Sequence, residues 1–197
     1  MDELKTIDTG IDCNAIESMD SVQDLLDKYG RPNPSYSPEK TPTGLTVNYA
    51  YNVLQWPGME FLEDYIRQGY EEFTGIKGTP LYVQCWVNIL TTGQRISPHT
   101  HAIRYPSHYD PPISPTHAVE DFVSGHFHVK VNESSFNYYG DENEPVMNKN
   151  GMLTIFSPYV SHHTDVVVDD ERISFAFDII SEDLFNRYPE LINWVKI

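Results

Sequence analysis

The sequence predicts a mainly β protein, built as a two-sheet barrel or jelly roll with α-helices at its flanks. Residues 81–90 form a continuous apolar run rich in Val, Ile, Tyr and Trp, which is typical of a strand buried on both faces. Helical spacing of apolar residues appears before this run, and a helix-start signal appears near the end of the chain. Between them, short strand patterns are separated by turn residues, at 95–101, 121–131, 134–139, 151–157, 160–168 and 171–180.

The helical patterns divide the chain into a core and two flanks. Apolar residues at helical spacing predict one helix over 19–29 and a second over 59–73. Four prolines within 31–44 predict a linker between them. Ser181, followed by two acids, predicts the start of a C-terminal helix that reaches about Trp194. We therefore expect a single domain over 1–197, with a helical and linker part at 1–80, a β core at 81–180 and a C-terminal helix at 181–197.

Composition limits the kinds of partner and site. The 197 residues are 40% hydrophobic, which suits a folded domain, and the formal net charge is −16. This charge argues against a nucleic-acid backbone or an anionic membrane surface as partner. Two cysteines, Cys13 and Cys85, are too few for a disulfide framework or a thiolate zinc cluster. With a polar N-terminus and no long apolar segment, we expect a soluble cytoplasmic protein.

Histidines mark the candidate site. All eight lie between residues 99 and 163, inside the strand-rich region. His99 and His101 are two positions apart, so in an extended segment their side chains share one face and could hold a metal ion together. His162, in a later strand pattern, is the third candidate ligand.

A polar pair on the last predicted strand indicates an anion site. Arg172 and Ser174 share one face of that strand, while the alternate positions are apolar. An arginine on such a strand is costly to bury without an anionic partner, and a small dicarboxylate would satisfy it with charge-assisted hydrogen bonds. Asn88, on the strand at 81–90, could be a further polar group of the same cavity or a structural hydrogen-bonding residue.

A long insertion follows the first two histidines. Residues 102–120 include four prolines, and a loop of this length beside a candidate site predicts a lid over the substrate. Its polar side chains His108, Asp110 and His117 are candidates for substrate contact, with plain exposure to solvent as the alternative.

The order of these motifs resembles the iron(II)/2-oxoglutarate-dependent oxygenase superfamily. The resemblance covers residues 81–180 and is most similar to an uncharacterised, partly phage-encoded branch with a Trp-x-Asn strand and an Arg-Ile-Ser strand. The motifs are Trp86-x-Asn88, Gly93, His99-x-His101, Ser124-Gly125, Gly151-x-Leu153-x-x-Phe156, His162 and Arg172-x-Ser174.

The resemblance implies a double-stranded β-helix, related to the cupins, and an Fe(II) site that uses 2-oxoglutarate and O₂. It implies that His99 and His162 are iron ligands, and that Arg172 and Ser174 bind the far carboxylate of 2-oxoglutarate. The implied activity is hydroxylation, with a protein side chain such as proline as the most generic substrate.

Further contacts follow from the resemblance. Asn88 would contact the cosubstrate. His126 and His128 share one strand face; if that face is inner, one of them, for which we choose His128, would bind 2-oxoglutarate, and exposure on the surface is the alternative. Asp165 would orient His162 or His163 from outside the ligand shell.

One position departs from the family pattern. His101 stands where the two-histidine, one-carboxylate triad has its carboxylate. Either His101 is the third ligand, or Asp110 replaces it from the loop, or His101 turns away and the site is inactive. A cupin-like three-histidine metalloenzyme without 2-oxoglutarate and a non-catalytic β-domain are therefore the alternative functions. Arg172 and Ser174 favour the oxygenase, because a cupin needs no buried arginine there.

Overall fold

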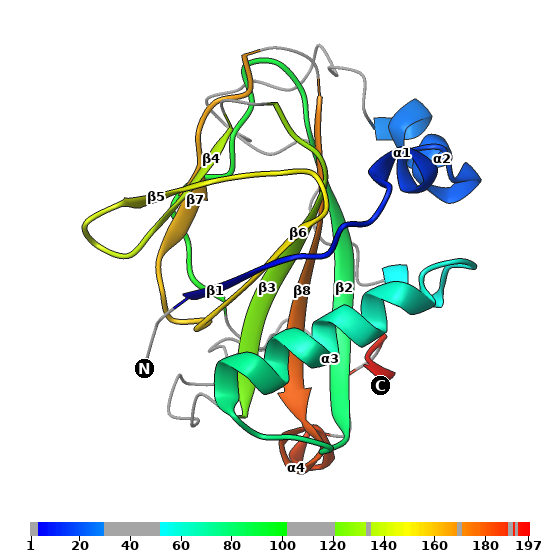
Figure 1. Cartoon of the computed structure of the whole chain (residues 1–197), viewed down its shortest axis with the longest axis vertical. Helices are drawn as coiled ribbons and strands as arrows, with labels where there is room; N and C mark the ends of the chain where they lie inside the picture. Colours follow the sequence, from blue (N-terminus) through cyan, green and yellow to red (C-terminus); the bar gives the residue numbers. More distant parts are fainter. Residues whose placement is uncertain are drawn as a thin grey trace.

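Two antiparallel sheets form the body of the computed structural model (Figure 1), which describes residues 4–29, 52–101, 121–132, 135–168, 171–188, 191 and 193–197. The larger sheet has the order β1-β6-β3-β8-β2-β9, and the smaller one has the order β5-β4-β7. The strands are β1 (Leu4–Asp8), β2 (Leu81–Leu90), β3 (Phe122–Lys130), β4 (Phe136–Tyr139), β5 (Glu144–Met147), β6 (Met152–Phe156), β7 (His162–Thr164), β8 (Arg172–Ser181) and β9 (Val195–Lys196).

The segment after β2 extends the smaller sheet. Its backbone runs beside β7, with hydrogen bonds from Thr164 N to Ile96 O at 3.1 Å and from His162 N to His99 O at 2.9 Å. A further bond joins Val167 N to Gln94 O at 2.9 Å. The predicted strand at 95–101 is thus extended beside β7, although only the His99–His162 pair forms a regular β-bridge.

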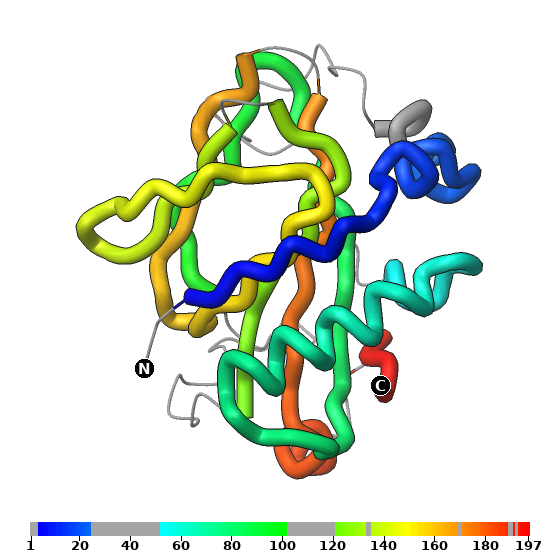
Figure 2. Tube along the Cα trace, in the orientation of Figure 1, coloured from blue at the N-terminus to red at the C-terminus, as the bar shows by residue number. Residues whose placement is uncertain are grey.

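The helical elements are α1 (Cys13–Glu17), α2 (Asp20–Tyr29), the 3-10 turn η1 (Val53–Gln55), α3 (Glu60–Thr74) and α4 (Glu182–Arg187). Leu184 of α4 packs in a small separate cluster with Phe122 and Ile180. The other four elements contribute to the main core on one face of the larger sheet. Helix α3 crosses this face, as Figures 1 and 2 show. It approaches β6 closely at Gly69, where a Cβ atom would lie 2.8 Å from the Ile155 side chain. A larger residue at Gly69 would therefore require the Ile155 side chain or the helix to shift.

Strand β8 shows how the larger sheet separates core from site. Its Ile173, Phe175, Phe177 and Ile179 are fully buried in the cluster that also contains Leu62, Ile66 and Tyr70 of α3. The alternate positions 172, 174, 176 and 178 point to the opposite face, toward the smaller sheet. One face of the strand thus supplies the hydrophobic core, and the other lines a polar cavity between the sheets.

Most of the predicted elements are confirmed. The helices expected over 19–29 and 59–73 are α2 and α3, and the run at 81–90 is β2. The patterns at 121–131, 134–139, 151–157 and 171–180 correspond to β3, β4, β6 and β8, and the pattern at 160–168 shortens to β7. The expected linker at 31–44 and lid at 102–120 lie outside the described residues.

The C-terminal helix is a correction. The sequence predicts a helix over 181–197, but α4 ends at Arg187, and Val195–Lys196 pairs with β2 instead. The proximal cause is Pro189, since the residue before a proline is driven out of the α region, and Tyr188 has φ −130° and ψ 70°. Strands β1 and β5 and helix α1 were not predicted. In the part of the chain that the structure describes, no helix is both long and apolar enough to cross a membrane.

Candidate metal centre and anion pocket

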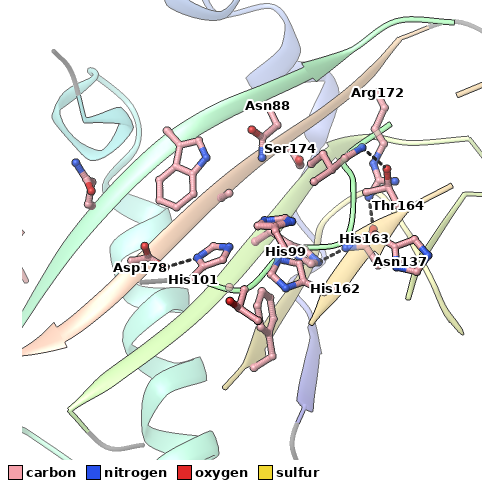
Figure 3. A pocket seen from close by; sticks show the side chains of 18 of the residues that line it. Asn88, His99, His101, Asn137, His162, His163, Thr164, Arg172, Ser174 and Asp178 are labelled. Atoms are coloured by element: carbon pink, nitrogen blue, oxygen red, sulfur yellow. Dashed lines mark hydrogen bonds and ion pairs between the residues drawn. The ribbon is translucent and has the colours of Figure 1, made fainter. Parts of the chain in front are cut away.

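Three histidines from two chain segments converge between the sheets. His99 and His101 lie on the extended segment after β2, and His162 begins β7. One ring nitrogen of each lies within 4.8 Å of the corresponding nitrogens of the other two (Figure 3). The His99–His162 bridge brings the segments together, so the two backbone hydrogen bonds between these residues fix the spacing of their rings.

The hydrogen bonds of the three rings leave the same nitrogen available on each. Nδ1 of His99 lies 2.9 Å from Ser97 O, and Nδ1 of His162 lies 3.1 Å from Val160 O. Nδ1 of His101 lies 2.6 Å from Asp178 Oδ1. Carbonyl and carboxylate oxygens only accept, so each Nδ1 carries the proton and each Nε2 presents a lone pair. This is the arrangement of histidines that bind metals, in which the second ring nitrogen donates to an oxygen.

Burial keeps two of these rings neutral. It lowers the pKa of His162 well below 6.5, and the neighbouring histidines lower it further. Burial also lowers the pKa of His99, although part of the His99 side chain reaches the surface. Since only the neutral ring has a free nitrogen, this environment suits metal binding.

A cavity of about 400 Å³ opens beside the three histidines. Beneath it lie three rows of side chains paired across β2, β8 and β3, all of which except His128 and Ser124 line the cavity. Asn88 lies opposite Ser174, which lies opposite His128; Trp86, Ala176 and His126 form the next row. Gln84, Asp178 and Ser124 form the third row. Ala176 is small, and its row leaves room for a bound molecule above the middle of the sheet.

Arg172 marks one end of this cavity. Its side chain is 4% exposed, and burial lowers its pKa to about 10. Nη2 donates to Asn137 Oδ1, whereas Nη1 has no hydrogen bond and lies 3.6 Å from the carboxylate of Asp165. Asn88 Oδ1 is also buried without a hydrogen-bond partner. Unpaired buried polar atoms are costly, so this end is built to receive a polar ligand, and the guanidinium favours an anion.

The two histidines of β3 have different surroundings. His126 lines the cavity, and its Nε2 lies 3.1 Å from both Asn137 Nδ2 and the hydroxyl of Tyr139. His128 is fully buried, neither of its ring nitrogens has a hydrogen bond, and it is not among the residues that line the cavity. The structure therefore places His126, rather than the predicted His128, on the wall beside Arg172.

The structure describes Asp165 and His163 among the other predicted residues, but not those of the expected lid. Asp165 is close to Arg172 and accepts a hydrogen bond from Phe136 N at 3.1 Å, whereas we expected it to orient a histidine. The ring of His163 stacks on Tyr138 with centroids 4.9 Å apart; it lines the cavity but is not one of the three clustered histidines. His108, Asp110 and His117 lie outside the described residues.

The residues at the opposite end of the cavity were not predicted from the sequence. Gln84, Trp86 and Trp194 line it, and Asp178 is buried there beneath His101. A signal for Asp178 was present, because it stands four and six positions after Ser174 and Arg172, on the same strand face. Trp194 could not be placed by that rule, because the sequence predicts it at the end of a helix rather than on a strand.

Comparison with known proteins bears on the fold. No protein-family model and no curated protein sequence matches the chain. Solved structures do match, at low identity. One is a viral collagen prolyl hydroxylase from Paramecium bursaria Chlorella virus-1 in complex with 2-oxoglutarate, with 14% identity, coverage of 91% of this chain and 96% of that chain, and a TM-score of 0.57.

Two further structures extend the comparison. A prolyl-4-hydroxylase from Pseudomonas putida shares 13% identity over 91% of this chain and 93% of that chain, with a TM-score of 0.55. HygX from Streptomyces hygroscopicus, with nickel and 2-oxoglutarate bound, shares 11% identity over 91% and 83% of the two chains, with a TM-score of 0.57.

This chain has the fold of the 2-oxoglutarate-dependent oxygenases. The predicted double-stranded β-helix is thereby confirmed, and its two sheets are those described above. At these identities the likeness concerns the fold, so the function has to be argued from the site itself.

Proposed function

We propose that this protein is an Fe(II)- and 2-oxoglutarate-dependent oxygenase that hydroxylates an organic substrate. One observation carries the proposal: a three-histidine cluster and a buried, incompletely paired arginine face the same cavity. A metal ion would bind the histidines, and a dicarboxylate that reaches from the metal would satisfy the arginine. 2-Oxoglutarate has both features, because its keto acid end chelates metals and its other end is a carboxylate.

Each residue has a role in this proposal. His99, His101 and His162 would hold Fe(II) through Nε2, since their Nδ1 atoms are already used. Arg172 would bind the far carboxylate of 2-oxoglutarate, supported by Asn137 and by the hydroxyl of Ser174. Asn88 and His126 would complete the polar wall. With three histidines as ligands, the proposal does not need Asp110 as a metal ligand.

When bound, Fe(II) with 2-oxoglutarate would activate O₂: one oxygen atom converts a substrate C–H bond to C–OH, and the other enters succinate as 2-oxoglutarate loses CO₂. The protein contributes position and shelter. Phe156 packs against the His162 ring with centroids 4.5 Å apart and against His101 at 6.0 Å. This apolar ring shields the ligands from water on one side.

The substrate would enter at the end away from Arg172. Gln84, Trp86 and Trp194 lie there, and they present one amide and two indole rings to the cavity. Two of the similar structures are prolyl hydroxylases, so a proline-containing peptide is the first substrate to test. Turnover would be read as the gain of one oxygen atom by mass spectrometry, with release of an equal amount of succinate.

A second candidate is a three-histidine metalloenzyme that uses no 2-oxoglutarate. The observation that favours it is the absence of a carboxylate from the three-residue cluster of candidate ligands. The buried Arg172 argues against it, because such an enzyme would leave this cation without a purpose.

Calorimetric titration distinguishes the two candidates. 2-Oxoglutarate is titrated into protein loaded with Mn(II), which is stable in air, and into metal-free protein. We expect binding that depends on the metal, and weaker binding of glutarate, which has both carboxylates but no keto oxygen to chelate the ion. Equal affinities for 2-oxoglutarate with and without Mn(II) would contradict the oxygenase.

A further inference from the structure

Asp178 is a buried carboxylate at the metal end of the cavity. It lies on the inner face of β8 and is 8% exposed. Its Oδ1 accepts a hydrogen bond from Nδ1 of His101 at 2.6 Å (Figure 3). The same oxygen accepts a second one from Oγ of Ser124, also at 2.6 Å. Within the described ranges no lysine or arginine forms an ion pair with it. A carboxylate buried without a cation is costly, so its charge needs an explanation.

The other two histidines of the cluster lack such a partner. Nδ1 of His99 and of His162 donate to backbone carbonyls, which carry a dipole but no net charge. His101 alone has a full negative charge behind it. His101 is also the residue that occupies the carboxylate position of the common two-histidine, one-carboxylate triad.

We propose that Asp178 is a positioning residue that supplies, through the ring of His101, the negative charge that a ligand carboxylate would otherwise provide. The inference rests on the proposed metal site. Three neutral imidazoles leave both positive charges of a divalent ion uncompensated by its ligands, and Asp178 restores one negative charge one ring further out. The short hydrogen bond also fixes which nitrogen of His101 faces the metal and makes that nitrogen a stronger donor.

Ser124 holds Asp178 in place. It is fully buried on β3 and lies directly opposite Asp178 in the sheet register. Its hydroxyl and the His101 ring donate to the same oxygen, which orients the carboxylate edge toward the ring. Ser124 contributes a hydrogen bond and no charge. A variant of Ser124 therefore tests the effect of holding the carboxylate in place, separately from the effect of its charge.

The test compares Co(II) affinity in five variants, one of them a double variant, with that of the wild type, by calorimetry without 2-oxoglutarate. Asp178→Asn keeps the shape and can still accept both hydrogen bonds, but it loses the charge. We expect Co(II) binding to weaken by about 10–100-fold, the usual effect of removing a group that orients a metal ligand. Asp121→Asn is the charge-matched control: Asp121 accepts a hydrogen bond from Ser181, away from the histidines, and its variant should bind Co(II) like the wild type.

Two further comparisons separate this role from a merely structural one. Ser124→Ala should lower the unfolding temperature yet change Co(II) affinity much less than Asp178→Asn. In a His101→Asp background the loss caused by Asp178→Asn should be much smaller, because the ring that links Asp178 to the metal is gone and a ligand carboxylate already supplies the negative charge.

Three results would overturn the inference. They are an unchanged Co(II) affinity in Asp178→Asn, an equal loss in Ser124→Ala, and the same loss in the His101→Asp background as in the wild type. If the wild type itself binds no Co(II), the proposed metal site fails, and that result is distinguishable from these because it appears before any variant is compared.

Discussion

The two ends of the cavity carry opposite charges, and they differ in how completely the charged group is hydrogen-bonded. At one end Arg172 is buried with an unpaired Nη1, next to an unpaired Asn88 oxygen. At the other end Asp178 is buried with two short hydrogen bonds from His101 and Ser124. Both charges lie on the inner face of β8, six residues apart.

The difference indicates which charged group is available to bind a ligand and which is already bonded within the protein. A buried cation whose Nη1 lacks a hydrogen bond costs stability until a ligand satisfies it, so in our proposal Arg172 would contribute to binding at the expense of stability. A satisfied carboxylate contributes to the structure already, and it acts on a ligand only through the ring that it holds. Variants at the two ends should therefore change different properties.

The largest effect is expected between the two ends, at the metal ligands. His99→Ala or His162→Ala should abolish Fe(II) retention, because each removes one of three donors. Metal analysis after anaerobic dialysis measures this. His163→Ala is the matched control, because its ring stacks on Tyr138, and it should retain the metal. Full retention in His162→Ala would place the ligands elsewhere.

The next effect belongs to the cation end. Arg172→Met should weaken 2-oxoglutarate binding by about 1.5–3 kcal/mol, the worth of a hydrogen bond to a charged group. It should change the free energy of unfolding by less than about 1 kcal/mol, because Asn137 Oδ1 keeps the bond from Asn148 and Asp165 stays in contact with water. Titration calorimetry and urea unfolding give the two values, with Arg95→Met as the exposed control. Unchanged affinity would remove Arg172 from the cosubstrate site.

The reverse pattern is expected at the carboxylate end. Ser124→Ala should lower the free energy of unfolding by about 1.5–3 kcal/mol, since it removes a buried hydrogen bond to a charged group. The affinity of the Mn(II)-loaded protein for 2-oxoglutarate should stay within about twofold, because Ser124 is in the row of side chains farthest from Arg172. A large loss of affinity with no loss of stability would reverse the comparison between the two ends.

The last prediction concerns stability alone and is a pH dependence that originates near Arg172. Burial lowers the pKa of His126 and His128 well below 6.5, and the charge of Arg172 lowers both further. In the unfolded chain these rings take up protons as the pH falls through about 6.5, whereas in the folded protein they stay neutral. Their contribution to stability is therefore complete above that pH and is lost progressively below it.

For each ring the free energy of unfolding should fall by about 1.4 kcal/mol per pH unit below pH 6.5. Urea unfolding of the metal-free protein at several pH values between about 7.5 and 5 measures the slope. His128→Gln should reduce this slope by the contribution of one ring, about 1.4 kcal/mol per pH unit. A slope unaffected by this variant would mean that His128 is protonated in the folded protein.

The alternation of residues along strands predicted the Arg172 end of the site but only part of the other end. Arg172, Ser174 and Asn88 follow from the two-residue period of β8 and β2. The same period reaches Asp178, but its importance depends on contact with His101, 77 positions earlier in the chain. Such a contact follows from the way the two sheets face each other, which local sequence does not encode.

The missed elements have a similar cause. Strand β1, with the sequence Leu-Lys-Thr-Ile-Asp, is half exposed and lacks an apolar pattern; it forms because every residue pairs with β6, about 150 positions away. Strand β9 likewise exists through pairing with β2. The helices were predictable because their hydrogen bonds and apolar stripes are local. Fold class and long elements could thus be read from the sequence, whereas edge strands could not.

The most direct test of the metal and cosubstrate site is the anaerobic addition of 2-oxoglutarate to the Fe(II)-loaded protein. A keto acid that chelates ferrous iron gives a weak visible charge-transfer band. We predict that this band appears with 2-oxoglutarate in the wild type and is absent in His162→Ala. Fe(II) that stays bound to the wild type without the band, at saturating 2-oxoglutarate, would contradict the oxygenase proposal.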